Sequence, residues 1–217
     1  KKKKHSISHM DLYPDIAILD GNLTLTLPTD ISIITILDAL SHSFEAIWNK
    51  NANEKSTKYA IEAISIILGN VDSLKENPSD FNIRKKLIDA SAKAGLAFSN
   101  TKTAAAHSIS YPLTIRFGIP HGVASSLSLI PLLEINGKHI KESLNQICYE
   151  LDLTYKELIE KIKGIPKGSI PYTLSEWGVA KSDFSQLVDE SFTKGRMDNN
   201  IVDLTKDQVL EILHSIK

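Results

Sequence analysis

The stretch TDISIITILDALSHSFEAIWN, residues 29–49, decides the fold of this chain. Its apolar residues fall at positions 33, 37, 40, 44 and 47, which is the spacing of one face of an α-helix. Thr29 or Asp30 is a suitable N-cap, because each has a side-chain oxygen that can accept a backbone N–H. The stretch therefore predicts an amphipathic helix that begins near residue 29 and buries one face.

Comparable patterns continue to the C-terminus. They predict helices over 54–69, 80–100, 101–111, 121–136, 138–151, 154–163, 170–179, 181–194 and 205–216. Gly69 is expected to end one of these helices, and another is expected to stop before Pro112, because a proline disfavours helical backbone in the residue that precedes it. From residue 29 onward the prediction is all-α.

Residues 1–28 have a different pattern. The runs IAIL and LTLTLP carry β-forming residues, and Pro14, Gly21 and Pro28 punctuate them, so short strands are expected here. The chain opens on four lysines rather than Met. We therefore expect the C-terminal part of a longer protein, with remnant strands of another domain in 1–28 and an all-helical domain in 29–217. A tag or a processed terminus is the alternative.

Composition excludes several classes of protein. The chain has 217 residues and a formal net charge of −1, which argues against nucleic acid or an anionic membrane as a general electrostatic partner. Cys148 is the single cysteine, so no internal disulfide can form and a reducing, cytoplasmic setting is expected. No apolar run approaches the roughly 20 residues of a membrane span.

A first group of polar residues lies on the predicted helix of residues 29–49. Asp38 and His42 are four residues apart and Glu45 follows three later, so all three share one stripe of the helix. Their apolar neighbours predict burial, and a buried carboxylate and imidazole need a partner or a metal. A hydrogen-bonded structural pair is the common alternative. Glu45 could orient His42 or face solvent.

A second group flanks the segment YPLTIRFGIP. His107 lies near the end of one predicted helix, and His121 begins the next. A helix N-terminus disfavours an imidazolium, and neutral imidazole is the form that binds metal. Either histidine alone is more often structural. Together with Asp38 and His42, however, they form a set of three nitrogen donors and one oxygen donor, which suits Fe(II), Zn(II) or another divalent metal.

The stretches LYPDIAILD, LTLTLP, DALSHSFEA, AGLAFSNTKTAAAH and IPHGVASSLSLIP together resemble the metal-dependent, so-called iron-containing, alcohol dehydrogenases. The resemblance covers most of the chain. It implies a mainly helical, dehydroquinate synthase-like metal-binding domain. The metal ligands of that family fall on Asp38, His42, His107 and His121.

The resemblance also implies a preceding α/β domain that binds NAD(H) or NADP(H) with a Gly-Gly-Gly-Ser turn. The sequence contains neither GGGS nor G-x-G-x-x-G, so the chain looks like the metal domain with a short β remnant of the nucleotide domain. Lys3, His5 and Leu27 are then candidate cofactor contacts. The implied reaction is reversible reduction of an aldehyde or ketone, in which the metal polarises the carbonyl and the nicotinamide supplies hydride. Family members commonly form homodimers or larger homo-oligomers.

One position departs from the family pattern. Many members carry a histidine four residues after the third ligand, where this chain has Tyr111, and the change indicates a different substrate pocket. Arg116 and Arg196 could bind an anionic group through their guanidinium forks. The segments KKKHSISH, HSISYPLTIRFGIPHG and GRMDNNIVDLTKDQVLEIL resemble the phosphonoacetaldehyde reductase branch, which reduces phosphonoacetaldehyde to 2-hydroxyethylphosphonate. Tyr111, Arg116 and Arg196 are therefore candidate substrate contacts.

Two alternatives remain open on the sequence. The chain could belong to a dehydrogenase of ordinary short-chain alcohols. It could also be a truncated, redox-inactive helical module that binds a metal or another protein, since the phosphate-binding turn is missing. A dehydroquinate-synthase-like lyase is disfavoured, because that relative resembles a Glu-His-His site instead.

Overall fold

The computed structural model describes residues 9–217 and is mainly helical over that range. Its α-helices are α1 (Thr29–Ile47), α2 (Glu54–Glu76), α3 (Phe81–Thr101), α4 (Ala105–Phe117), α5 (His121–Leu127), α6 (Leu129–Asn136), α7 (Lys141–Leu151), α8 (Tyr155–Gly164), α9 (Phe184–Ser191) and α10 (Lys206–Ser215). Short 3-10 helices, among them η1 (Met10–Leu12), η2 (Gly21–Thr24) and η4 (Ser175–Trp177), lie between them. The candidate cofactor contacts Lys3 and His5 lie outside the described residues.

Helix α1 confirms the prediction made from its apolar spacing. The five apolar residues of the pattern are at most 4% exposed, namely Ile33, Leu37, Leu40, Phe44 and Ile47. The predicted cap was wrong, because the N-cap is Pro28 and makes no side-chain hydrogen bond. The Ser32 hydroxyl instead donates to the Pro28 carbonyl at 2.9 Å.

Two predicted helix ends were wrong for the same reason. Helix α2 continues through Gly69 to Glu76, and α4 continues through Pro112 to Phe117. Ile109 and Leu113, before and after this proline, are fully buried. Packing of a buried face therefore outweighs the cost of a glycine or of one lost backbone hydrogen bond. Helix α4 ends instead at Gly118, whose φ of 68° belongs to the left-handed region.

Three later predictions also need correction. The helix expected from residue 121 is divided at Ser128 into α5 and α6. The helix expected over 170–179 is only the short η4, because Pro171 and Gly178 bracket it and Gly178 has a φ of 75°. The helix expected over 181–194 becomes a 3-10 turn followed by the shorter α9.

The strands expected in 1–28 do not form within the described part of that range. Residues 9–28 contain η1 and η2, and the β-bridge found in residues 9–217 is an isolated one between Asn49 and Asn200. A β-forming run needs a neighbouring strand to satisfy its backbone groups, and none lies beside this segment. Ile16 and Ile18 are accordingly 81% and 86% exposed. The division into two domains stays a prediction.

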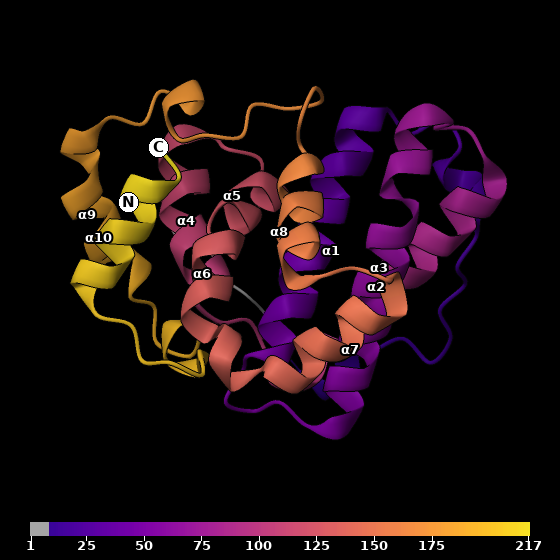
Figure 1. The fold of residues 1–217 in the computed structure, drawn as a ribbon, viewed down its shortest axis with the longest axis horizontal. Helices are drawn as coiled ribbons and strands as arrows, with labels where there is room; N and C mark the ends of the chain where they lie inside the picture. The colour runs from indigo at the N-terminus through magenta and orange to yellow at the C-terminus, as the bar shows by residue number, and fades with distance from the viewer. Residues whose placement is uncertain (1–8) are drawn as a thin grey trace.

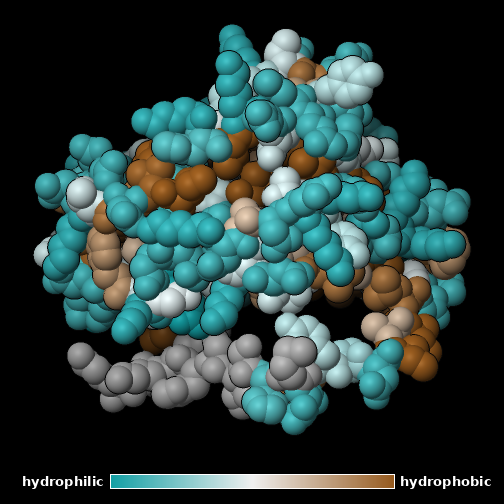
Figure 2. Space-filling view, turned by 90° about the horizontal axis from the view of Figure 1, so that it is seen from below, coloured by the Kyte–Doolittle hydropathy of each residue, from teal (hydrophilic) through white to brown (hydrophobic). Residues whose placement is uncertain are grey.

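The helices form two groups joined by a central layer. In Figure 1, α1, α2 and α3 lie at one end, α9 and α10 lie at the other, and α4, α5 and α6 lie between them. Helix α1 packs against α5, and α4 packs against both α5 and α9. Figure 2 shows a largely hydrophilic surface with apolar side chains reaching it in places. Within the described residues, no helix combines the length and apolar character needed to cross a membrane.

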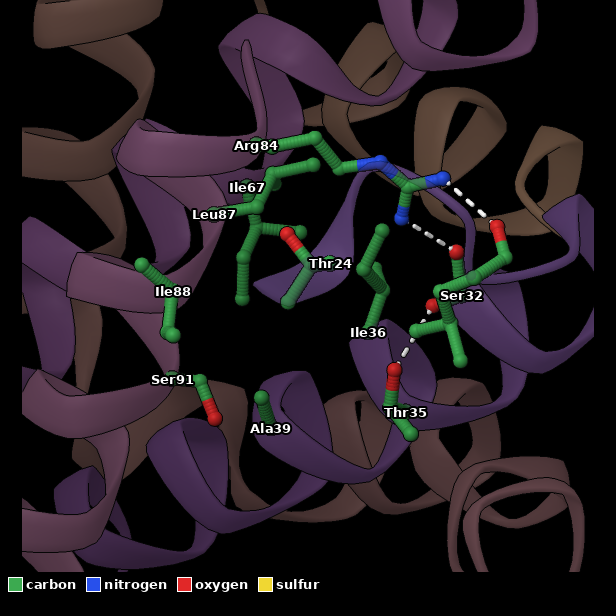
Figure 3. Close-up of a pocket in the computed structure, with 11 residues that line it drawn as sticks. Thr24, Ser32, Thr35, Ile36, Ala39, Ile67, Arg84, Leu87, Ile88 and Ser91 are labelled. Carbon is green, nitrogen blue, oxygen red and sulfur yellow. Dashed lines mark hydrogen bonds between the residues drawn. The ribbon is translucent and has the colours of Figure 1, made fainter. Parts of the chain in front are cut away.

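A buried arginine fixes the start of α1. Arg84 of α3 is 3% exposed, and its Nη1 donates to the Ser32 hydroxyl at 2.6 Å while Nη2 donates to the Leu27 carbonyl at 2.7 Å. Figure 3 shows the guanidinium reaching from α3 toward Ser32 at the edge of a small pocket. Leu27 lines this pocket. The clamp ties the entry of α1 to α3 and so fixes the helix that carries Asp38.

Candidate metal centre

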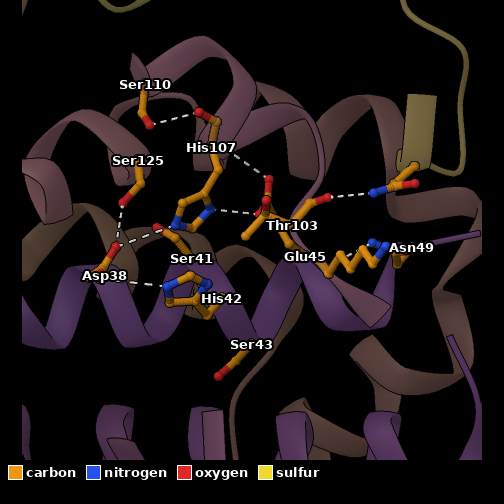
Figure 4. Close-up of polar contacts among 12 residues, drawn as sticks. Asp38, Ser41, His42, Ser43, Glu45, Asn49, Thr103, His107, Ser110 and Ser125 are labelled. Carbon is orange, nitrogen blue, oxygen red and sulfur yellow. Dashed lines mark hydrogen bonds and ion pairs between the residues drawn. The ribbon is translucent and has the colours of Figure 1, made fainter. Parts of the chain in front are cut away.

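Three of the four predicted ligands converge where α1, α4 and α5 meet. Asp38, His107 and His121 each offer one ligand atom, and these atoms lie within 4.8 Å of one another. The Nε2 atoms of His107 and His121 are 3.5 Å and 3.8 Å from Oδ1 of Asp38. Figure 4 shows the His107 ring suspended over α1 and directed toward Asp38. Residues 83 positions apart in the chain thus face one point.

A glycine permits this convergence. A Cβ built on Gly122 would lie 2.0 Å from the Ile34 carbonyl oxygen and 3.1 Å from Cβ of Asp38. Only a residue without a side chain lets the backbones of α5 and α1 approach this closely. Since Gly122 follows His121 directly, the close approach is what carries the His121 ring to Asp38.

Glu45 performs two tasks at the start of α4. It is fully buried, and its Oε2 lies 2.6 Å from Nδ1 of His107. Its Oε1 accepts the His107 backbone N–H at 3.0 Å. The N-cap of α4 is Ala104, whose side chain has no oxygen to accept a hydrogen bond. Glu45 of α1 therefore acts as the cap in its place. The carboxylate also keeps the proton on Nδ1, so that Nε2, which faces Asp38, is the nitrogen that can bind a metal once it loses its own proton.

The sequence left open whether Glu45 orients His42, and the structure gives it His107 instead. Burial raises the pKa of Glu45. The charge of His107 and the hydrogen bonds from His107 and the start of α4 lower this pKa by more than burial raises it, so the net shift is downward. Glu45 is therefore an anion under ordinary conditions, as its role toward His107 requires.

Asp38 is held by its neighbours on three sides. The Ser125 hydroxyl of α5 donates to its Oδ1 at 3.1 Å, and Nε2 of His42 lies 3.6 Å from its Oδ2. Burial raises the pKa of Asp38, yet the hydrogen bonds and charges of His107 and His42 outweigh burial and hold that pKa far below its ordinary value. Asp38 therefore presents an ionised carboxylate to the centre.

His42 lies beside the three converging ligands rather than among them. Its ring stacks on His107 with the centroids 4.1 Å apart and on Phe98 with the centroids 4.0 Å apart. Burial, followed by the charge of His107, lowers the pKa of His42 despite the opposing effect of Asp38. A neutral imidazole next to an ionised carboxylate is a suitable metal donor.

An open cavity of about 660 Å³ adjoins this cluster. Its walls include His42, His107 and His121, the predicted substrate contacts Tyr111 and Arg196, and several residues that the sequence did not single out, namely His9, Leu12, Tyr13, Phe98 and Lys102. Two other predicted contacts lie elsewhere. Arg116 is absent from this lining and forms a paired contact with Glu190, both bonds being 2.6 Å. Leu27 lines the separate pocket beside Arg84.

Comparison with known proteins agrees with this arrangement. Residues 32–217 match the model of the Fe-containing alcohol dehydrogenase family, C-terminal part. This chain belongs to the iron-containing alcohol dehydrogenase family. The helical fold expected from the resemblance is therefore confirmed, apart from the missing strands.

Individual members of the family are moderately similar to the chain. An NADPH-dependent butanol dehydrogenase of Clostridium saccharobutylicum is 28% identical over 225 residues, which span 98% of this chain and 58% of that protein. Sulfoacetaldehyde reductase of Bifidobacterium kashiwanohense, solved with NAD+, is 28% identical with a TM-score of 0.84 over 94% of this chain and 55% of that one. An iron-containing alcohol dehydrogenase of Thermococcus thioreducens is 26% identical with a TM-score of 0.84, covering 97% of this chain and 56% of that one.

The chain thus spans about half the length of the relatives it matches. Its similarity to these iron-containing alcohol dehydrogenases concerns the helical, C-terminal part of the family. Lys102 and His9 of the cavity wall lie at no helical spacing from a predicted ligand, so the sequence alone did not single them out.

The residues present fit a divalent metal. Nε2 of His107 is buried and lies 3.5 Å from Oδ1 of Asp38, too far for a normal hydrogen bond, which is costly unless another species pairs with it. Burial lowers the pKa of His107, but the Glu45 carboxylate hydrogen-bonded to its Nδ1 and the carboxylate of Asp38 facing its Nε2 raise that pKa to about 9. A metal binding at Nε2 would replace that proton and satisfy the same two carboxylates.

Proposed function

We propose that this chain supplies the metal centre of a metal-dependent, NAD(P)-linked alcohol dehydrogenase or aldehyde reductase. Asp38, His42, His107 and His121 are the proposed ligands, and Fe(II) or Zn(II) is the proposed metal. The observation that carries the proposal is the convergence of three of these donors within 4.8 Å at the wall of an open cavity. Membership of the iron-containing alcohol dehydrogenase family supports the same chemistry.

The bound metal would polarise a substrate carbonyl as a Lewis acid and stabilise the alkoxide in the reverse direction. The chain's own residues prepare the site for it. Glu45 fixes the His107 ring, and Ser125 fixes the carboxylate of Asp38. His42 requires only a small displacement of its stacked ring to join them, because its Nε2 already lies 3.6 Å from Asp38.

The nicotinamide cofactor would be bound mainly by an α/β domain outside the helical part described here. Two relatives support such a cofactor, since one is named as NADPH-dependent and another was solved with NAD+. The cavity opens beside Tyr111 and the proposed ligands, which leaves room for a nicotinamide and a small substrate.

For the substrate, we propose a short-chain aldehyde or alcohol with an anionic group, phosphonoacetaldehyde being the specific candidate. Arg196 on the cavity wall supports an anionic substrate. A relative named as a sulfoacetaldehyde reductase is 28% identical to this chain, which supports the same class. Ordinary short-chain alcohols are the second candidate. The apolar wall residues Leu12 and Phe98 and a relative named as a butanol dehydrogenase favour this class.

Metal content tests the proposal directly. The chain would be reconstituted with Fe(II) under anaerobic conditions and, separately, with Zn(II), and the bound metal would be measured by mass spectrometry. Near-stoichiometric metal is expected in the wild type, with loss in the His107→Ala, His121→Ala double variant. A matched His139→Ala, His214→Ala variant, which changes two histidines outside the cluster, should retain its metal. No metal in the wild type, or equal metal in all three proteins, would contradict the proposal.

A further inference from the structure

We propose that Arg196 and Lys102 form an anion-binding subsite on the cavity wall, with Tyr111 as the platform that positions Arg196. The subsite would take the phosphonate, sulfonate or similar terminal group of a short-chain aldehyde or alcohol whose carbonyl end lies at the metal centre. The inference rests on the proposed function and deepens it, because it assigns the substrate class to particular residues.

The first observation is the position of the Arg196 guanidinium. Its central carbon lies 4.5 Å from the centroid of the Tyr111 ring, which is cation–π stacking. The Tyr111 ring in turn stacks on His121, with the centroids 6.1 Å apart and the planes 17° apart. The guanidinium is thus placed one aromatic ring away from a proposed metal ligand. A substrate held at both ends must therefore be short.

The position of Tyr111 also explains the departure from the family pattern. A histidine at position 111 would offer a smaller ring and, when protonated, would repel a guanidinium stacked on it. Tyrosine is uncharged and offers a larger π face to a cation. The replacement therefore gives Arg196 a place to lie against the cavity wall.

The second observation is the backbone of Lys102. Its φ and ψ are 65° and 178°, a region that is open to glycine and strained for other residues. The conformation is enforced by neighbours, since the Asn49 side chain donates to the Lys102 carbonyl at 3.1 Å and the Lys102 N–H donates to the Phe98 carbonyl at 2.7 Å. A glycine would fit this backbone without strain. A lysine here is explained if its charge is used on the cavity wall, which it lines.

The third observation is the charge of the lining. Among residues 9–217, those that line the cavity include Lys102 and Arg196 but no aspartate or glutamate. The nearest carboxylate of the cluster, Asp38, would be neutralised by the metal. The described part of the wall therefore carries a net positive potential, and a guanidinium and an ammonium lining one cavity suit a phosphonate or sulfonate.

Arg116, the other arginine considered from the sequence, is a weaker candidate. It is outside this lining, and its Nε and Nη2 already donate to the two carboxylate oxygens of Glu190. Of the two arginines expected to bind the anion, the structure therefore favours Arg196 on the cavity wall over Arg116 in the last turn of α4.

Binding of ethylphosphonate to the metal-loaded full protein tests the subsite without catalysis. Calorimetry is expected to show ethylphosphonate binding in the wild type and at least about 10-fold weaker binding in Arg196→Gln, the loss typical of one charge-assisted pair. Lys194→Gln is the matched control, because it removes a positive charge from the same loop but lines a different surface hollow. It should bind ethylphosphonate as the wild type does. Equal binding in Arg196→Gln and the wild type would overturn the proposal.

Lys102→Gly separates function from folding. The variant should melt at a higher temperature than the wild type, because it relieves the strained backbone, and yet bind ethylphosphonate more weakly. Tyr111→Phe should keep the aromatic platform and most of the affinity for ethylphosphonate. Tyr111→Leu should lose the platform and with it most of that affinity. Unchanged affinity in both Lys102→Gly and Tyr111→Leu would overturn the roles given to these residues.

Two further arms identify the source of the anion and keep the two proposals apart. If ADP competes with ethylphosphonate and Arg196→Gln weakens the binding of both ligands equally, the subsite belongs to the cofactor phosphates and the substrate assignment is wrong.

In kinetic assays, the ratio of kcat/KM for an anionic over a neutral short-chain aldehyde should fall about 10- to 100-fold in Arg196→Gln. Ethylphosphonate binding that depends on Arg196 in a protein without dehydrogenase activity would support the subsite and contradict the proposed reaction. Dehydrogenase activity with no preference for the anionic aldehyde would support the proposed reaction and contradict the subsite.

Discussion

Oε2 of Glu45 lies 2.6 Å from Nδ1 of His107, and the other oxygen of the same carboxylate accepts the backbone N–H of that histidine. One buried side chain of α1 therefore sets both the start of α4 and the direction in which Nε2 of His107 points. The proposed metal centre would therefore depend on a residue that need not touch the metal.

Glu45→Gln is expected to weaken metal binding by about 10- to 100-fold, the usual effect of losing a partner that orients a metal-binding histidine. The amide is isosteric, so the helix start should still be capped through its oxygen. Competition with a chelator of known affinity would measure the change. Glu62→Gln, which removes from α2 a carboxylate paired with Lys93 of α3, is the control and should bind metal normally. Equal affinities for the two variants would contradict the role of Glu45.

Gly122→Ala is expected to destabilise the fold by at least about 2 kcal/mol, as overpacking against backbone does. The new methyl group would lie 2.0 Å from the Ile34 carbonyl oxygen, and α5 would have to move away from α1. Urea unfolding would measure the stability, and metal affinity should fall as well. Gly69→Ala is the matched control, since its Cβ would meet only Leu151 at 3.9 Å. It should be neutral or stabilising by up to about 1 kcal/mol.

The metal-free protein is expected to lose stability as the pH rises from about 6.5 to about 9. The pKa of His107 in the folded chain is about 9, compared with an ordinary value of 6.5. Because the folded state binds a proton that the unfolded state releases, the stabilisation is complete below the lower value and gone above the higher one. Denaturant unfolding of metal-free protein across this range would show the decline. A decline of the same size in His107→Gln would assign it to another group.

Arg84→Met is expected to destabilise the protein by about 2 to 4 kcal/mol, because buried carbonyls and a hydroxyl lose their donors. The change leaves Leu27 and Ser32 without the guanidinium that joins them to α3. Thermal unfolding would measure the loss. Lys86→Met, an exposed cation on the same helix, should alter stability by less than about 0.5 kcal/mol. Comparable losses in both variants would mean that the clamp contributes little.

Local sequence was a reliable guide wherever one helix determined the outcome. The apolar spacing of residues 29–49 predicted α1 and its buried face. The i, i+4 relation placed Asp38 and His42 on one stripe, and the start of α5 at His121 was also correct. It was a poor guide to helix ends at Gly69 and Pro112, because local propensities of about 1 to 3 kcal/mol are outweighed by burial of neighbouring apolar side chains.

The sequence by itself determined the all-helical character of residues 29–217 and the set of donor side chains, because periodicity and residue chemistry are local properties. Only the tertiary structure decided which donors meet. It assigned Glu45 to His107 rather than to His42, placed Arg196 on Tyr111, and separated Arg116 from the cavity. Those relationships depend on how closely α1, α4 and α5 approach one another. The contact at Gly122, between residues distant in the chain, sets that approach between α1 and α5.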